Sequence, residues 1–217
     1  MPDIFDEVDE DLRAERMRQL LTRYGGVVIA AVVLVIVGVG GWQYWQGVQA
    51  RRNAAVAQQF LTALDSAASQ APAARQGAVV ALADVAAHGN AGYAVLAELR
   101  EASLEADLGK AAEAQALWAK VAADASADPL LRDVAVLQSV LHEIGRGKPE
   151  ALKARLAPLA AAGSPWRPLA QEAEALIDLE QGQKQEARTI LKQLATDAAA
   201  PQGVRGRASA MLAWLDE

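Results

Sequence analysis

The chain has 217 residues, a net charge of −6 and no cysteine. Its length suits one ordinary domain and a short additional segment. The lack of cysteine excludes disulfides, thiolate metal sites and the lipid-modified cysteine of a bacterial lipoprotein. Hydrophobic residues form 53% of the chain and aromatic residues only 5%, a composition that favours closely packed helices. The sequence has no basic stripe, so we expect no nucleic-acid binding.

Residues 1–23 form an acidic tail that also contains arginine. Ile4, Val8 and Leu12 recur every four residues, a spacing typical of a short amphipathic helix. The acidic composition favours a solvated, partly disordered segment. The pattern therefore leaves two alternatives, a solvated tail or a segment that docks on a partner.

Residues 24–46 are predicted to cross a lipid bilayer as one helix. The stretch from Gly25 to Trp42 has no charged side chain. A helix of this length spans about 27 Å, close to the thickness of the hydrocarbon core. Aromatic residues, which favour the membrane–water interface, flank it. These candidate membrane-interface residues are Tyr24 on one side and Trp42, Tyr44 and Trp45 on the other.

The arginines that flank this helix predict its orientation in the membrane. Four of them, Arg13, Arg16, Arg18 and Arg23, precede it closely, and two, Arg51 and Arg52, follow it. Because basic flanks stay in the cytoplasm, we expect a cytoplasmic tail (1–23) and a periplasmic domain (47–217) at the inner membrane. A cleaved signal peptide is the alternative, since 48–50 resembles a weak cleavage site. The long apolar core and the aromatic cluster favour an uncleaved anchor.

Three helices are predicted next in the chain. They cover 48–68, 73–87 and 92–108, and each carries apolar residues at helical spacing. Pro72 separates the first from the second, and the run from 88 to 90 ends the second.

Two markers then recur along the chain with a common period. Glu-Ala pairs follow a glycine in three places, at Gly109/Glu113-Ala114, Gly147/Glu150-Ala151 and Gly182/Glu186-Ala187. Prolines recur at Pro129, Pro165 and Pro201. The three glycines are predicted to be the repeat turns that end a helix with φ > 0, and the prolines to open new helices.

Helix pairs with a period slightly above 34 residues are typical of tetratricopeptide repeats. We therefore expect an all-α chain: a single transmembrane helix followed by a tetratricopeptide repeat-like α-solenoid with a concave face. The last helix, 203–217, is predicted to cap the stack.

The arrangement resembles the YfgM-like family of ancillary SecYEG translocon subunits. The resemblance is carried by the mixed acidic and arginine tail, the run Gly41-Trp42-Gln43-Tyr44-Trp45-Gln46 after one span, and the turns at Gly109 and Gly182. It implies a bitopic inner-membrane protein with a periplasmic repeat domain. The implied partners are the SecYEG translocon and a membrane-anchored periplasmic chaperone/prolyl isomerase, and the implied role is to assist newly exported proteins.

No catalytic pattern is present in the sequence. His88 and His142, the only histidines, lack metal-ligand spacing, and no nucleophile motif or phosphate loop occurs. We therefore expect neither enzymatic activity nor a cofactor.

Aromatic and basic residues supply the candidates for partner binding. Trp118 and Trp214 are expected in the repeat core, and Trp166 is expected to be partly exposed. Arg132, with Arg100 and Arg155, is a candidate for contacts with acidic partner residues. The predicted function is a membrane-anchored, non-catalytic protein-binding module, and the alternative is an envelope or cell-division scaffold.

Overall fold

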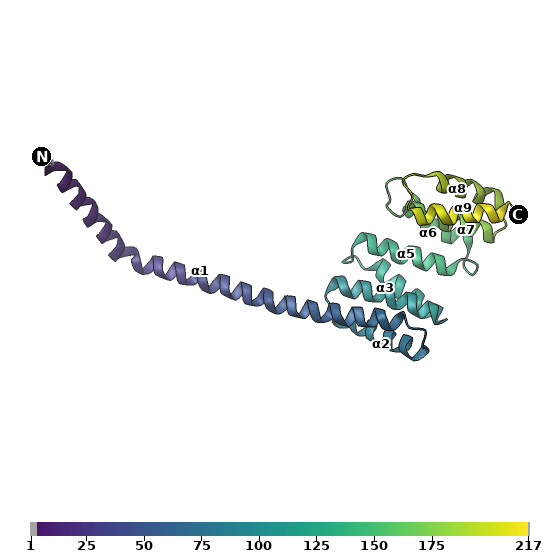
Figure 1. Cartoon of the computed structure of the whole chain (residues 1–217), viewed down its shortest axis with the longest axis horizontal. Coiled ribbons are helices and arrows are strands. Elements are labelled where there is room, and N and C mark those ends of the chain that lie inside the picture. The colour runs from purple at the N-terminus through teal and green to yellow at the C-terminus, as the bar shows by residue number, and fades with distance from the viewer. Residues whose placement is uncertain (1–3, 217) are drawn as a thin grey trace. The chain divides into compact units, whose positions relative to one another are not determined.

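The computed structural model describes the backbone of residues 4–216 and the side chains of 26, 30 and 33–216. Over these residues the chain is all-α, with nine helices (Figure 1). They are α1 (Ile4–Ala67), α2 (Pro72–His88), α3 (Ala91–Asp107), α4 (Ala111–Ala123), α5 (Pro129–Glu143), α6 (Pro149–Ala160), α7 (Arg167–Glu180), α8 (Lys184–Thr196) and α9 (Gln202–Leu215). The chain divides into two compact units, Met1–Ala54 and Ala55–Glu217.

The first unit consists of the N-terminal part of α1. Its large apolar side chains from Val33 to Trp45 are 53–77% exposed, so the described part of the unit does not bury them. Within the described residues, no helix is long and apolar enough to span a membrane. The side chains of seven residues of the predicted span, at 24, 25, 27–29, 31 and 32, lie outside the described set, as does the structure of residues 1–3.

The second unit is a stack of helix pairs closed by α9. Residues 55–67 of α1 pair with α2, and the pairs α3–α4, α5–α6 and α7–α8 follow. The first helix of each pair contacts the first helix of the next: α3 contacts α5, and α5 contacts α7. Helix α7 in turn contacts α9. Over the described residues the second helices (α2, α4, α6, α8) make no such contacts. The stack therefore curves toward the first helices, which we call the inner helices (α3, α5, α7 and α9).

Each inner helix packs through fully buried alanine. One such residue from each helix is Ala97, Ala135, Ala170 or Ala208, all with 0% exposure; Ala102, Ala173 and Ala175 are also at 0%. A methyl side chain at this position lets neighbouring helices approach closely, which explains why an alanine-rich sequence forms a continuous core. Trp118 of α4 is the largest fully buried side chain, with 1% exposure.

Two of the predicted turn glycines have the backbone geometry that the sequence indicates. Gly109 has φ +82° and Gly182 has φ +73°. The amide of the next residue closes each turn: Lys110 N–H donates to the Glu105 carbonyl at 2.9 Å, and Gln183 N–H to the Asp178 carbonyl at 2.8 Å. This is the arrangement by which a left-handed residue ends a helix.

In the middle pair, the prediction for Gly147 is wrong. Gly145 has φ +79°, while Gly147 is not among the positive-φ residues. Helix α5 ends at Glu143, and Ile144 (φ −55°, ψ 133°) and Gly145 form the centre of a turn that Arg146 N–H closes by donating to the Glu143 carbonyl at 2.9 Å. The third position of such a turn requires positive φ, and Gly145 stands there. Gly147 is packed instead, because a Cβ on it would lie 3.2 Å from Leu152 Cδ2. In the other two pairs the alanine of the Glu-Ala pair is buried (Ala114 and Ala187), whereas in α6 Leu152 is buried and Ala151 is exposed.

The proline markers start helices in different ways. Pro129 is the first residue of α5, and Asp128 caps that helix by accepting a hydrogen bond from Leu130 N–H at 2.8 Å. Pro165 lies outside α7, which begins at Arg167. The Ser164 hydroxyl instead accepts a bond from Trp166 N–H at 3.2 Å and stabilises the turn before α7.

Candidate protein-binding surfaces

The inner helices carry a row of apolar side chains at equivalent positions. Leu96, Val134 and Leu169 each stand one residue before a buried alanine of α3, α5 or α7. Leu96 is 38% exposed, and the other two are half-buried. Helical geometry places this position about 100° from the buried alanine. Of the three, Leu169 also packs against the core clusters that include residues of α6 and α8. We call these three residues the inner face.

The opposite side of the inner helices is charged and is occupied by internal ion pairs. Glu98 of α3 receives a 2.6 Å hydrogen bond from Lys120 of α4, and this bond raises the pKa of Lys120. Asp178 of α7 pairs in the same way with Lys153 of α6. Both carboxylates are at least 89% buried at the side chain, so these charges bind helices to each other and are not available to a partner.

Arg155 belongs to this internal network. It donates to the Glu143 carboxylate at 2.7 Å and to the Ser139 hydroxyl at 2.5 Å, and Ser139 bonds in turn to Gln115. The network joins α4, α5 and α6 across the centre of the stack. A partner contact by Arg155 would have to compete with these bonds.

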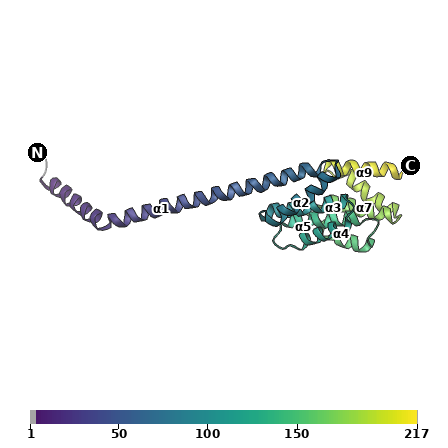
Figure 2. The same cartoon turned by 90° about the horizontal axis from the view of Figure 1, so that it is seen from below.

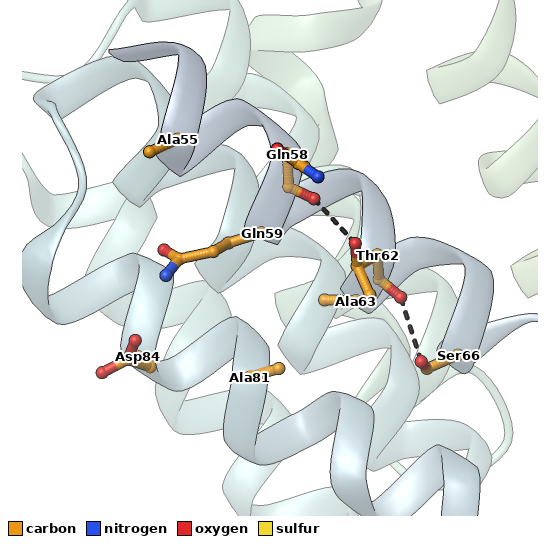
Figure 3. A pocket seen from close by; sticks show the side chains of 8 residues that line it. All are labelled: Ala55, Gln58, Gln59, Thr62, Ala63, Ser66, Ala81 and Asp84. Atoms are coloured by element: carbon orange, nitrogen blue, oxygen red, sulfur yellow. Dashed lines mark hydrogen bonds between the residues drawn. The ribbon is translucent and has the colours of Figure 1, made fainter. Parts of the chain in front are cut away.

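A separate groove lies between the end of α1 and α2 (Figure 3). Its volume is about 500 Å³, and it is lined by Ala55, Gln58, Gln59, Thr62, Ala63, Ser66, Ala81 and Asp84. The hydroxyls of Thr62 and Ser66 donate back to their own helix, at 2.9 and 3.0 Å. Asp84 is its one charged lining residue. This lining suits a polar segment better than an apolar one.

The two residues predicted to bind a partner do not form one site. Trp166 is half-buried before α7, packs against the α5–α7 core, and its indole nitrogen is buried without a hydrogen bond. Arg132 is half-buried on α5, and its Nε is likewise buried without a bond. Within the described residues no hydrogen bond or ion pair joins them.

The other tryptophans divide sharply between core and surface. Trp118 lies in the core, as expected. The expectation for Trp214 is wrong, since its side chain is 62% exposed on α9. No further helix follows α9 in the described chain to cover it.

Histidines show no arrangement for chemistry. His88 Nδ1 lies 3.0 Å from the Asp84 carboxylate one turn away, and the His142 ring lies 4.6 Å from the Trp118 ring. The described residues contain no cluster of three or more side chains that could hold a metal ion.

Sequence reasoning missed the inner face. A signal was present, since each of its residues directly precedes an alanine at the repeat period. Only the register of the helices shows that this alanine is the buried one.

Comparison with protein-family models matches the tetratricopeptide repeat-like domain over residues 18–212. No curated protein and no solved structure matches the chain. Domains of this kind are generally non-catalytic protein-interaction modules, which fits the surfaces described above. The match covers nearly the whole chain, including the helix stack, and the chain belongs to the tetratricopeptide repeat-like domain family.

Proposed function

We propose that this protein is a single-pass inner-membrane protein whose periplasmic helix stack binds other proteins. Residues 24–46 form the anchor and 1–23 remain in the cytoplasm. Three features support this topology: the uncharged stretch from Gly25 to Trp42, the excess of arginines before it, and the exposure of its described apolar side chains.

The inner face is the proposed binding surface. The observation that carries this proposal is the apolar row of Leu96, Val134 and Leu169 across three adjacent helices. Such a row fits the apolar side of an amphipathic helix, or alternate side chains of an extended segment. The half-buried residues offer a small contact area, so the contact is weak by itself. Attachment to a membrane raises the effective concentration of partners at the same membrane and so offsets that weakness.

The proposed partners are the SecYEG translocon and a membrane-anchored periplasmic chaperone/prolyl isomerase, and the proposed clients are newly exported proteins. Support comes from the resemblance to the YfgM-like family in the tail, the aromatic run after the span and the repeat turns. A translocon-associated module would meet exported chains before they fold, when their apolar segments are exposed.

Site-specific photo-crosslinking in intact cells tests this proposal. A photoreactive side chain at Val134, in the inner face, is compared with one at Val80, which is 70% exposed on the outer helix α2. We expect adducts from Val134 with translocon subunits, the chaperone or exported proteins, and far fewer from Val80. Equal yields from both positions would refute the inner face as the binding surface. Adducts with cell-division proteins alone would support the scaffold alternative.

A further inference from the structure

The apolar row of the inner face continues along α5 and α7, which lie next to each other in the stack (Figure 2). In α7, Leu176 and Glu180 follow Leu169 by seven and eleven residues, and Leu176 is half-buried. Both spacings return to within about 20° of the starting direction around a helix. In α5 the same spacings run from Val134 to Leu141 and to the turn at Gly145. The apolar row therefore ends, about 16 Å from its start, at Gly145 and Glu180.

A pocket of about 180 Å³ lies at that end, between the turn after α5 and the last residues of α7. Its volume suits one side chain and not a drug-sized ligand. Glu180 is the one charged residue of its lining, and the apolar walls are Ile144, Pro149, Leu152 and Ile177. Gly145 lines the pocket without a side chain. A Cβ built there would lie 3.5 Å from Glu180 Oε2, so the glycine leaves the carboxylate uncovered.

The Glu180 carboxylate has no partner within the part of the chain that the structure describes. Its side chain is exposed, and it forms no hydrogen bond or ion pair there. Asp178, two residues earlier in α7, is instead buried and paired with Lys153 of α6. The charge of Asp178 is therefore used inside the stack, whereas the charge of Glu180 is free to bind a cation from outside it.

Two further features of the pocket favour a positive charge. The pocket lies at the C-terminal ends of α5 and α7, where the helix dipole places partial negative charge. The cations of the neighbouring turn, Arg146 and Lys148, are exposed and do not line the pocket. Among the described residues, no positive group therefore occupies the space beside Glu180.

We propose that this pocket receives a lysine or arginine side chain of a protein segment bound along the inner face, an inference that rests on the proposed binding function. The aliphatic part of the side chain lies against the apolar walls, and its charged group reaches Glu180. A purely apolar side chain would desolvate the carboxylate without giving it a partner, and an acidic one would be repelled. A long basic side chain matches both parts of the pocket.

The length of the strip also specifies the spacing in the bound segment. An extended chain covers 16 Å in about five residues. We therefore expect an apolar residue, which contacts Val134 and Leu169, and a basic residue about five positions away, which enters the pocket.

Photo-crosslinking in intact cells tests this inference, with the photoreactive side chain at Val134 as before. Glu180→Gln removes the charge at nearly constant size. The matched control is Glu113→Gln, at an exposed carboxylate in the first turn of α4, away from the pocket. We expect Glu180→Gln to lower the yield of protein adducts roughly three- to fivefold, and Glu113→Gln to leave it unchanged. Mass spectrometry of the adducts should identify attached segments with lysine or arginine about five residues from the attachment point.

The outcomes separate this inference from the proposed function. If Val134 still gives more adducts than Val80 but Glu180→Gln leaves the yield unchanged, the inner face binds proteins and the pocket receives no basic side chain. Attached segments without a nearby basic residue, or a higher yield from Glu180→Gln, would likewise overturn the inference. If Val134 gives no more adducts than Val80 in the unsubstituted chain, the proposed function fails and the inference fails with it. Urea unfolding of Glu180→Gln should match the unsubstituted chain, because Glu180 has no internal partner to lose, and this excludes misfolding as the cause of a lower yield.

Discussion

Alanine substitution of Gly182 tests how the repeat turns are built. At φ +73° a residue with a Cβ is strained by about 1–2 kcal/mol. Alanine also lowers the conformational entropy of the unfolded chain, which stabilises the folded state by roughly 0.4–1 kcal/mol. No atom lies within 4 Å of the added Cβ, so steric overlap adds nothing. The net expectation is a loss of about 1 kcal/mol of unfolding free energy.

The same substitution at Gly77 should act in the opposite direction. Gly77 lies inside α2, exposed, with no atom within 4 Å of an added Cβ. Alanine there should stabilise the helix by about 0.5–1 kcal/mol. The double variant Gly109→Ala/Gly182→Ala should lose about 2 kcal/mol, because the two turns belong to separate pairs.

Urea unfolding of the full-length chain, followed by far-UV circular dichroism, measures these changes as shifts of the midpoint at constant slope. Asparagine tolerates the left-handed region, so Gly182→Asn should cost less than Gly182→Ala. The reasoning is refuted if Gly182→Ala is neutral while Gly77→Ala destabilises, or if asparagine costs as much as alanine.

Three further predictions follow from burial, charge and topology. Burial, and then the Glu105 and Glu98 carboxylates, raise the pKa of Glu101. The associated stability is present at low pH and is lost as pH rises through this raised pKa. Glu101→Gln should therefore raise the unfolding free energy at pH 7 by up to about 1 kcal/mol and lose this gain in acid. An equal gain in unfolding free energy at pH 7 and in acid would contradict the raised pKa of Glu101 as the cause. In urea unfolding, Trp118→Ala should lower the unfolding free energy by about 3–5 kcal/mol, whereas Trp214→Ala, at an exposed position, should lower it by less than about 0.5 kcal/mol. Similar losses from the two variants would contradict the assigned burial. For topology, an impermeant thiol reagent added outside the inner membrane should label Ala57→Cys and not Asp3→Cys, and the reverse pattern would overturn the proposed orientation.

Much of the helix stack could be predicted because its signals are local. The common period of the Gly/Glu-Ala and proline markers predicts paired helices, and the family match confirms a tetratricopeptide repeat-like domain. Gly109 and Gly182 could be identified as left-handed turn residues, because each acts within its own few residues of backbone.

Other features depended on register and on neighbours far along the chain. Three glycine-containing turns look alike in sequence, yet only the observed end of α5 decides that Gly145, and not Gly147, takes positive φ. The binding candidates Trp166 and Arg132 were chosen by residue type, which does not report what packs around them.

What the sequence determined by itself was the helical repeat and its turns, because spacing and backbone preference act over a few residues. The tertiary structure decided which side of each helix remains free. Ala175 and Ala213 stand at the same position of their helices, five residues after the buried Ala170 and Ala208, and one is buried while the other is exposed. Helix α8 packs over this position in α7, whereas within the described residues no helix packs over it in α9. The difference is made by packing between helices and not by residue type.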